Sequence, residues 1–585
     1  MMRKTKIVCT IGPASESVEM LEKLMKAGMN VARLNFSHGT HEEHKLRIDN
    51  IKKVRQQLNK PVAIMLDTKG PEVRLGKFKT GSEELVVGQS FTLTTRDIEG
   101  DNSIVSISYK SLPDEVSKGT RILIADGLIE LTVTDKNETD VFCRVVNGGT
   151  VSDRKNVNIP GATSKLPAVT DKDIDDISFG IDNDIDFIAA SFIRKASDVY
   201  EIRRILEQRH ADHIQIISKI ENQQGVDNCE EILRVSDGLM VARGDLGVEI
   251  PTQDIPLVQK RMIAMANALG KPVITATQMM ESMIRNPRPT RAEVTDIANA
   301  IFDGTDAVML SGETAAGKYP FETVTTMAAV AERTETALDY RKKLVKSDGN
   351  NDITVTNAIS YASCAAAMDL GASAIITPTQ SGSTARMVSK YRPKAPIIAA
   401  TPDERVARKL SLSFGVAPVT VIPTDSTDEM IQHSVDKALE AELIANGDLV
   451  VITAGIPVGV AGTTNLIKVH VVGEIIAKGM GIVNKAATGR VCIVKNGEKE
   501  IDKINEGDIL VAEATDIDMI PFMMKAAAFI VEEGGLTSHA AIVGLELGKP
   551  VVVGVEKAAD ILTDGQIVTV DGSRGLIYRG RARVL

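Results

Sequence analysis

The sequence predicts an α/β protein built around a TIM barrel, in which eight strands alternate with helices. Short apolar runs alternate with amphipathic stretches of helical period up to about residue 345. Eight such runs occur, and most of them end in polar or charged residues. Barrels of this class carry their chemistry at the carboxyl ends of the strands. A long segment after the third run lacks helical period and predicts an inserted β-domain.

The eight predicted strands are apolar segments of barrel length. They cover residues 5–11, 29–36, 61–66, 186–192, 214–221, 238–243, 272–277 and 307–310. The helices predicted between them include residues 18–27, 42–58, 198–208, 259–269 and 293–302. A strand followed by a helix, repeated eight times, is the TIM-barrel pattern.

The chain of 585 residues is long enough for several domains. We expect the barrel at 1–69 and 170–345, and the inserted β-domain at 70–169. Glycine-punctuated β-runs, including 90–95, 119–124 and 141–146, support the insertion. Because it joins the barrel through two hinges beside the strand ends, it is predicted to act as a lid. A further α/β domain is expected at 346–473 and a last domain at 474–585.

Composition narrows the class of protein. The net charge of −10 argues against a nucleic-acid partner. Apolar runs of membrane length and a signal-peptide pattern are both missing, so we expect a cytoplasmic protein without a membrane partner. The five cysteines are scattered and form no CxxC pair, which argues against a disulfide framework and a zinc site.

Lys219, Glu221 and Asp245 are the leading candidates for chemistry. Lys219 and Glu221 are two apart in a predicted strand and therefore share a face. Magnesium usually takes one or two protein carboxylates together with phosphate oxygens, and a lysine adds a compact positive charge. The pattern predicts a metal-assisted phosphoryl site. The alternative is an ordinary surface Lys/Glu pair at a strand end.

Three other patterns suggest sites but favour simpler explanations. The segment 312–318 resembles a P-loop, but Tyr319 stands where a magnesium-binding Ser or Thr is required. The histidines at 38, 41 and 44 suggest a metal-binding face, although Glu42 and Glu43 favour a solvated helix start. Methionines 279, 280 and 283 are expected to be packing residues.

A loop rich in hydroxyl groups, residues 379–384, precedes a helix predicted to begin at Ala385. Hydroxyls, glycine and free amides at a helix start can hold an anion. The alternative is an ordinary serine-rich helix cap.

Several segments resemble the pyruvate kinase family. They are ARLNFSHG (32–39), LDTKGPEVR (66–74), SKIEN (218–222), ARGDLGVEI (242–250), ITATQMMESM (274–283) and the stretch 289–315. The resemblance implies transfer of a phosphoryl group from phosphoenolpyruvate to ADP, giving pyruvate and ATP. It also implies a lid that closes over the site and a homotetramer.

The resemblance assigns roles residue by residue. Arg33 would hold the transferring phosphate, and Lys219 would stabilise that group and the enolate. Glu221 and Asp245 would hold Mg²⁺, and the substrate carboxylate would meet the turn at Gly244 and Asp245. Thr277 would orient the substrate and take part in a proton relay through water, because its hydroxyl is too weak an acid to protonate carbon alone. The implied nucleotide contacts are Asn35, Phe36, Ser37, His38, Arg74 and Lys155.

A monovalent cation is also implied. Asn35, Ser37, Asp67 and Thr68 offer hard oxygen ligands, which suit such a cation better than a transition metal. In the resembled family this set binds K⁺. Glu72 matches the glutamate of potassium-dependent members, where potassium-independent members carry lysine.

The loop 379–384 matches the family's effector loop. The matched positions are Thr379, Ser381, Gly382, Ser383 and Thr384. Members that bind a bisphosphate add a basic or aromatic loop, but the matching stretch 455–462 has no positive charge. We therefore expect a monophosphate effector such as AMP or ribose 5-phosphate.

The last segment resembles a different family. Residues 534–554 are similar to the phosphohistidine domain of phosphoenolpyruvate-utilising phosphotransferases, with His539 at the phosphorylated position. An ATP-grasp partner domain is absent from the sequence, so a structural or regulatory remnant is favoured over catalysis.

Two alternative functions remain open from the sequence. A TIM-barrel lyase acting on a magnesium-bound enolate would share the Glu221 and Asp245 pattern without needing Arg74 and Lys155. A non-catalytic sugar-phosphate sensor would need the 379–384 loop alone.

Overall fold

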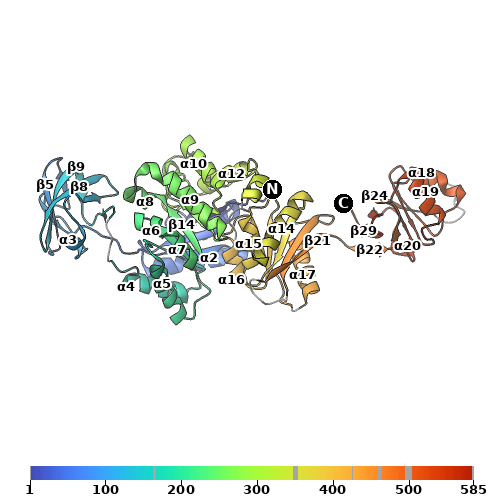
Figure 1. Ribbon diagram of the computed structural model, residues 1–585, viewed down its shortest axis with the longest axis horizontal. Coiled ribbons are helices and arrows are strands. Elements are labelled where there is room, and N and C mark those ends of the chain that lie inside the picture. The colour runs from blue at the N-terminus through green and yellow to red at the C-terminus, as the bar shows by residue number, and fades with distance from the viewer. Residues whose placement is uncertain are drawn as a thin grey trace. The chain divides into compact units, whose positions relative to one another are not determined.

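The computed structural model describes residues 2–161, 166–346, 354–424, 426–456, 463–494 and 503–582 (Figure 1). The described chain divides into two compact units. The first comprises Met1–Asn351, Ser389–Arg392 and Asp403–Pro418, and the second comprises Asp352–Val388, Pro393–Pro402 and Val419–Leu585.

A closed parallel barrel forms the body of the first unit, which confirms the predicted fold class. Among the described residues, its strands are β1 (Lys6–Thr10), β2 (Val31–Asn35), β3 (Ala63–Asp67), β12 (Phe187–Ala190), β13 (Gln215–Ile220), β14 (Gly238–Ala242), β15 (Val273–Ala276) and β16 (Ala307–Leu310). Neighbours in the chain are neighbours in the barrel, and β1 pairs with β16 to close it.

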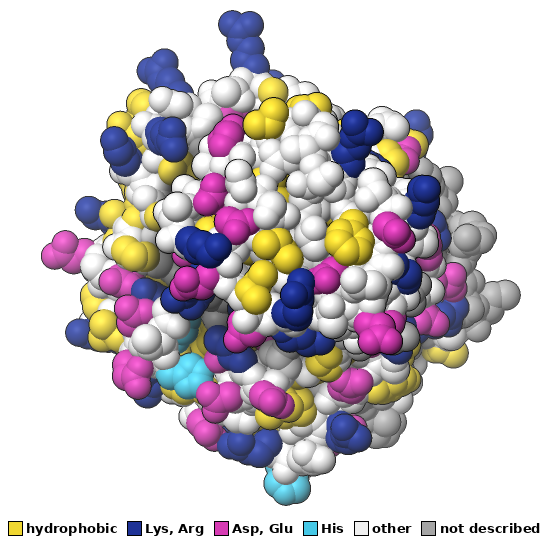
Figure 2. Space-filling model, turned by 90° about the vertical axis from the view of Figure 1, so that its left-hand side faces the viewer, with side chains coloured by type: hydrophobic (Ala, Val, Ile, Leu, Met, Phe, Trp, Pro, Cys, Tyr) yellow, Lys and Arg dark blue, Asp and Glu magenta, His cyan; other side chains and the backbone are white. Residues whose placement is uncertain are grey.

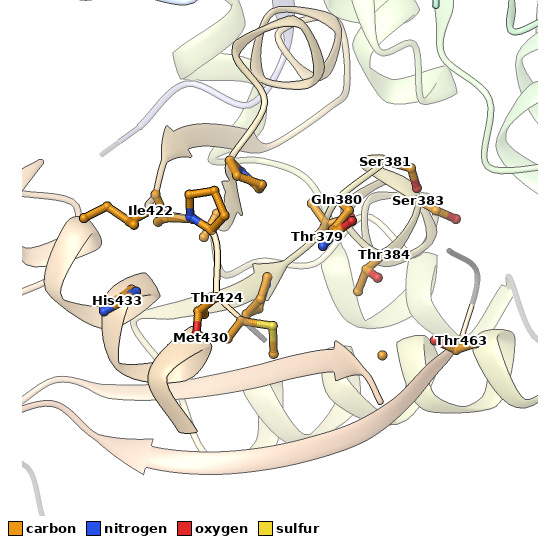
Figure 3. Close-up of a pocket in the computed structure, with 16 residues that line it drawn as sticks. Thr379, Gln380, Ser381, Ser383, Thr384, Ile422, Thr424, Met430, His433 and Thr463 are labelled. Atoms are coloured by element: carbon orange, nitrogen blue, oxygen red, sulfur yellow. The ribbon is translucent and has the colours of Figure 1, made fainter. Parts of the chain in front are cut away.

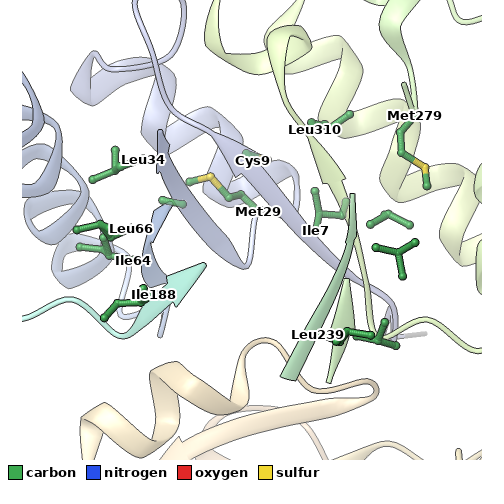
Figure 4. Packing of buried hydrophobic residues seen from close by; sticks show 14 of the residues in the cluster. Ile7, Cys9, Met29, Leu34, Ile64, Leu66, Ile188, Leu239, Met279 and Leu310 are labelled. Atoms are coloured by element: carbon green, nitrogen blue, oxygen red, sulfur yellow. The ribbon is translucent and has the colours of Figure 1, made fainter. Parts of the chain in front are cut away.

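Side chains that point alternately to the two faces of each strand form two apolar layers. Ile7 and Cys9 of β1 face the outer layer between strands and helices, whereas Val8 faces the barrel interior. Figure 4 shows part of the outer layer, including Leu34 and Leu66. Fully burying one such aliphatic side chain contributes about 1.5–3 kcal/mol. These layers fix the strand ends in place.

Helices surround the barrel, and some of them begin at capping boxes. Thr40 and Glu43 form a capping box at one helix start, and Thr290 and Glu293 form another. The helices are α1 (Val18–Ala27), α2 (His41–Gln57), α4 (Asp171–Asp182), α5 (Ala196–Gln208), α6 (Gln223–Asp227), α7 (Cys229–Val235), α8 (Arg243–Glu249), η1 (Thr252–Asp254), α9 (Ile255–Ala268), η2 (Glu281–Ile284), α10 (Arg291–Asp303), α11 (Gly312–Ala315), α12 (Pro320–Glu335) and α13 (Tyr340–Lys346).

The insertion after β3 is a β-domain with its own apolar core. Its elements are β4 (Ser82–Leu85), β5 (Ser90–Thr94), β6 (Ile104–Ser106), α3 (Leu112–Glu115), β7 (Arg121–Ile124), β8 (Ile129–Lys136), β9 (Asp140–Asn147), β10 (Gly149–Ser152) and β11 (Val157–Asn158). One carboxylate ties both connections to the barrel: Asp173 accepts from Gly70 N at 3.1 Å and from Thr170 N at 3.0 Å.

The amino end of the barrel is closed by residues from later in the chain. Leu412 packs in the barrel interior beside Val8 and Met65. Arg392 forms an ion pair with Asp306, which precedes β16, at 2.8 Å. Residues 389–392 and 403–418 thus belong to the compact barrel unit, although they lie within the segment 346–473 that the sequence predicts to be an α/β domain.

The second unit contains an α/β sheet in the order β19-β18-β17-β20-β21. The elements of this α/β region are α14 (Val355–Asp369), β17 (Ala374–Pro378), α15 (Ser383–Lys390), β18 (Ile397–Thr401), α16 (Glu404–Leu410), β19 (Val416–Thr420), α17 (Thr427–Glu440), β20 (Leu449–Gly455) and β21 (Thr464–Val471). Of these, α16, the end of α15 and the start of β19 belong to the first unit. Helix α15 starts at Ser383, two residues before the predicted Ala385. Gly382 takes a φ of +78° and donates to Thr379 Oγ1, which turns the chain into the helix early.

The last domain is built on the sheet β22-β29-β28-β24-β25-β26-β27-β23. Its elements are β22 (Ile475–Lys478), β23 (Met480–Gly481), β24 (Ala486–Ile493), β25 (Ile509–Ala512), η5 (Ile517–Met519), α18 (Ile520–Lys525), β26 (Ala528–Val531), α19 (His539–Leu547), β27 (Val551–Val553), α20 (Ala558–Ile561), β28 (Ile567–Asp571) and β29 (Leu576–Arg579).

The surface and the helices agree with two features of the sequence, its mixed charge and its lack of apolar runs of membrane length. On the face shown in Figure 2, Lys and Arg side chains are interspersed with Asp and Glu and with scattered apolar groups. Of the helices in the described ranges, none combines the length and apolar character that crossing a bilayer requires.

Candidate active site

Lys219 lies at the carboxyl end of β13 with oxygen atoms around its ammonium group. Its Nζ lies 3.0 Å from Asp67 Oδ1 and 3.0 Å from Glu221 Oε1, and it donates to Ser191 Oγ at 2.7 Å. Burial alone would lower the pKa of Lys219, but Asp67 and Glu221 outweigh burial and raise it. Lys219 is therefore a fixed positive charge at the strand ends.

Arg33 adds a second buried cation from β2. Its Nε donates to Asp67 Oδ2 at 2.6 Å, and a terminal nitrogen donates to Thr10 Oγ1 at 2.8 Å. Burial acts to raise the pKa of Asp67, yet Arg33 and Lys219 outweigh it and hold that pKa below its usual value. Asp67 therefore orients both cations toward the same space.

Glu221 and Asp245 supply carboxylates beside Lys219. Glu221 accepts from Phe192 N at 2.6 Å, and Asp245 lies in α8, which begins directly after β14. Burial raises the pKa of both carboxyl groups, because the charged forms are removed from water. The charge of Asp126, from the lid, raises the pKa of Asp245 further.

The charge balance fits a divalent cation. Among the described residues placed above at this end, three carboxyl groups, of Asp67, Glu221 and Asp245, face the two cations of Arg33 and Lys219. Excess negative charge away from water is unfavourable unless a cation joins it. The oxygen ligands are those that magnesium prefers.

Thr277 follows β15 in a conformation that is rare for its residue type. Its φ is +68°, in the left-handed region that a β-branched residue seldom adopts. The hydroxyl accepts from Gly244 N at 2.8 Å and donates to Ala276 O at 2.7 Å. Thr277 is thereby fixed against the turn that carries Asp245.

The predicted potassium ligands lie at or just after the ends of the adjacent strands β2 and β3. Asn35 pairs in register with Asp67, and Asn35 Oδ1 accepts from Ser37 N at 3.1 Å. Glu72 forms an ion pair with Arg74 at 2.6 Å. The predicted nucleotide residue Lys155 lies exposed in the lid.

The prediction that the three histidines belong to a solvated helix start is wrong for His44. Its ring stacks on Phe36 at a centroid distance of 3.9 Å and is 1% exposed. Burial lowers its pKa. His41 instead pairs with Asp176 at 2.8 Å. The three methionines at 279, 280 and 283 are fully buried, which confirms their packing role.

Sequence analysis missed several site residues. Ser191 and Thr10 carry neutral hydroxyls, which give no charge signal in the sequence. Asp126 lies in a lid loop where it accepts from Asn156 Nδ2 at 2.6 Å. The signal that could have found it is the ADG turn at 125–127, whose residues all have positive φ.

A cavity in the second unit contains the predicted effector loop. One part is lined by Thr379, Ser381, Ser383 and Thr384, and another part by apolar groups and a histidine (Figure 3). The remaining lining residues are Pro378, Gln380, Ala400, Pro402, Val421, Ile422, Pro423, Thr424, Met430, His433, Gly455 and Thr463. Of the loop 455–462, residues 457–462 lie outside the described residues.

His539 is the first residue of α19 in the last domain. Its Nδ1 lies 3.0 Å from Thr515 Oγ1. Ser538 caps the helix by accepting from Ala541 N. The hydrogen bond at Nδ1 leaves Nε2 as the ring nitrogen available for another partner.

These observations define a class of protein before any comparison. A closed α/β barrel that gathers Lys219, Arg33 and several carboxylates at its strand ends has the features of an enzyme that uses a divalent cation on an anionic substrate, which fits phosphoryl transfer and also the lyase alternative.

Comparisons with known proteins identify the family. Residues 2–324 match the pyruvate kinase barrel domain, residues 357–470 match the pyruvate kinase alpha/beta domain, and residues 504–575 match the mobile domain of PEP-utilising enzymes. Pyruvate kinases of Bacillus licheniformis and Geobacillus stearothermophilus are each 56% identical to the chain, and the match covers 100% of both sequences. A pyruvate kinase structure from Cryptosporidium parvum aligns at a TM-score of 0.77 with 43% identity, covering 80% of this chain and 96% of that one.

The chain belongs to the pyruvate kinase family. It is a phosphotransferase that makes pyruvate and ATP from phosphoenolpyruvate and ADP in glycolysis. The family requires a divalent metal. This identification excludes the lyase and sensor alternatives.

Proposed function

We propose that Lys219 and Arg33 catalyse phosphoryl transfer as two fixed charges. Arg33 binds the phosphate of phosphoenolpyruvate, and Lys219 stabilises the transferring group and the enolate left behind. The observation that supports these roles is the position of Lys219 between Asp67 and Glu221, which keeps it protonated.

Glu221 and Asp245 are proposed to hold Mg²⁺, with the substrate carboxylate received at Gly244 and Asp245. When bound, the ion neutralises charge that develops on phosphoryl and enolate oxygens. Thr277 orients the enolate and passes a proton to its carbon through water. On the other side of the phosphate, ADP binds to Asn35, Phe36, Ser37, His38, Arg74 and Lys155.

Substitution of Lys219 by methionine tests the central role. Lys219→Met should lower turnover by about 10²–10³-fold, since a charge aimed at developing negative charge is removed. Turnover is followed by coupling pyruvate to a dehydrogenase, and substrate binding by calorimetry. Near-normal turnover would show that Lys219 does not act on the phosphoryl group.

A potassium site at Asn35, Ser37, Asp67 and Thr68 is proposed beside the phosphate. Turnover should be higher in K⁺ than in a bulky organic cation, and Glu72→Lys should weaken this dependence. The Glu72 carboxylate pairs with Arg74, so the substitution reverses the local charge. Equal turnover of the wild type in both cations would contradict the proposed potassium site.

The cavity at 379–384 is proposed to bind a monophosphate activator. The phosphate meets the hydroxyls of Thr379, Ser381, Ser383 and Thr384 and the backbone of Gly382. The apolar wall at Ile422 and Met430 accommodates the remainder of the ligand. Replacing Ser383 and Thr384 by alanine should remove activation by AMP or ribose 5-phosphate and preserve the basal rate. Stronger activation by fructose 1,6-bisphosphate would contradict the monophosphate assignment.

The last domain is proposed to be separable from catalysis. Deleting residues 474–585 should preserve turnover, because every proposed catalytic residue lies in the barrel and lid. His539→Ala should also leave turnover intact. Transfer of label from phosphoenolpyruvate to His539 would instead identify a working phosphohistidine.

The family resemblance further supports a cytoplasmic homotetramer with domains at 1–69 with 170–345, 70–169, 346–473 and 474–585. Sedimentation of the intact protein tests the tetramer. A monomer at assay concentrations would refute it.

A further inference from the structure

The turn after β15 carries two consecutive residues in the left-handed region. Thr277 has a φ of +68° and Gln278 a φ of +54°. L-residues avoid this region, and a β-branched threonine avoids it most. Such conformations persist where neighbouring groups over-determine them. The contacts around this turn therefore show what holds Thr277 in place.

Arg243 holds the first half of the turn. Its guanidinium donates to Ala276 O at 3.1 Å and to Thr277 O at 2.7 Å. Asp296 of α10 pairs with the same guanidinium at 2.7 Å. The backbone carbonyls before and within the strained pair are thus fixed from one side.

Glu313 holds the second half. This side chain lies in α11, after β16, and is 3% exposed. Its Oε1 accepts from Met280 N at 3.1 Å and its Oε2 accepts from Ser311 N at 2.7 Å. One buried carboxylate thereby joins the turn after β15 to the end of β16.

We propose that Glu313 is a positioning residue that keeps the Thr277 hydroxyl in place for proton transfer. Without its acceptor at Met280 N, the turn relaxes from the left-handed pair and the hydroxyl moves away from Gly244. Glu313 itself touches no reacting atom. The inference rests on the proposed role of Thr277.

Proton transfer can be measured apart from phosphoryl transfer. In the reverse direction the C3–H bond of pyruvate breaks, its electron pair forms the enolate, and the proton passes through the water relay at Thr277 to solvent, so exchange of the methyl protons with D₂O reports this step alone. Exchange is followed by NMR with the full-length enzyme, Mg²⁺ and K⁺. Glu313→Gln should slow exchange by about 10²-fold, as expected for a misplaced group. The KM for phosphoenolpyruvate should change little, because Glu313 is not proposed to bind the substrate.

Glu335→Gln is a matched control. Glu335 is 4% exposed and also accepts from two backbone amides, Lys4 N at 2.8 Å and Thr5 N at 2.7 Å, but at the amino end of β1. It should lose thermal stability as Glu313→Gln does and keep normal exchange. Equal exchange rates in the two variants would overturn the positioning role. If Glu313→Gln does not fold, Glu313→Asp and Glu335→Asp replace the pair.

Two further variants show which part of the proposal is wrong if the expected results are not found. Gln278→Gly relieves one strained residue, so it should restore most of the exchange lost in Glu313→Gln. Failure to restore it would contradict the strain argument. Thr277→Ala should abolish exchange. Normal exchange in Thr277→Ala would refute the proposed role of Thr277 itself, and the role of Glu313 with it. Slow exchange in Thr277→Ala with normal exchange in Glu313→Gln would refute only the latter.

Discussion

The two ends of the barrel bury charged side chains in different ways. At the amino end, Asp306 pairs with Arg392 and Asp186 pairs with Arg408 at 2.7 Å. At the carboxyl end, the carboxylates of Asp67, Glu221 and Asp245 exceed the cations of Arg33 and Lys219. The two amino-end carboxylates each have an arginine partner, whereas at the carboxyl end the carboxyl groups described above outnumber the cations.

This difference distinguishes charged residues that stabilise the fold from charged residues that bind a ligand. A buried ion pair with every partner in place contributes little net free energy, but breaking it is costly. An excess of buried charge destabilises the protein until a ligand neutralises it, which is why perturbed groups gather at active sites. The amino end should therefore respond to substitution through stability, and the carboxyl end through ligand binding.

The largest stability effect is expected at the amino end. Arg392→Met leaves the Asp306 carboxylate buried without its partner, which should cost about 3–5 kcal/mol. Calorimetry of the barrel transition measures this loss, and turnover at 25 °C should change little. Adding Asp306→Asn should recover part of the stability. If Arg392→Met lost turnover at unchanged stability, the amino end of the barrel would not have the purely structural role expected of it.

Metal removal should reveal the excess charge at the carboxyl end. Saturating Mg²⁺ should raise the thermal stability of the wild type by about 2.7 kcal/mol at a hundredfold excess over Kd. Asp245→Asn removes a carboxylate repelled by its neighbours, so the variant should gain less from the ion and lose turnover. The comparison uses thermal transitions with Mg²⁺ and with a chelator. Equal Mg²⁺ stabilisation in both proteins would place the metal elsewhere.

An effect on stability that is seen only when the pH is varied is expected from Lys6. Its Nζ donates to Val416 O at 2.6 Å, and burial lowers its pKa from 10.5 to about 7. Between these values the unfolded chain binds more protons than the folded one, so stability rises with pH. The contribution is at most about 1.4 kcal/mol per pH unit.

Lys6→Met should therefore flatten the rise in stability from pH 7 to pH 10. Urea unfolding of both proteins at several pH values gives the difference, in which all other titrating groups cancel. Parallel curves would show that Lys6 keeps its ordinary pKa.

The sequence predicted the local parts of this site well. Lys219 and Glu221 share a face because strand period is two, and the short distance from Lys219 Nζ to the Glu221 carboxylate follows from that spacing. The barrel strands were also predictable, since each is an apolar run ended by a polar residue. Each of these two patterns depends only on residues that are close together in the sequence.

Non-local features could not be predicted. The pattern after residue 346 is that of an ordinary α/β domain, so the insertion of Leu412 into the barrel interior gives no sequence signal. Similarly, Glu313 looks like part of a phosphate-loop pattern until its bonds to Met280 and Ser311 are seen. Contacts between distant segments depend on packing, which local periodicity does not describe.

Helix α15 belongs to both compact units at once. Its first residues, Ser383 and Thr384, line the proposed effector cavity, whereas Ser389–Arg392 are counted with the barrel. The chain that leaves the last turn of α15 leads to Arg392, whose guanidinium pairs with Asp306 before β16.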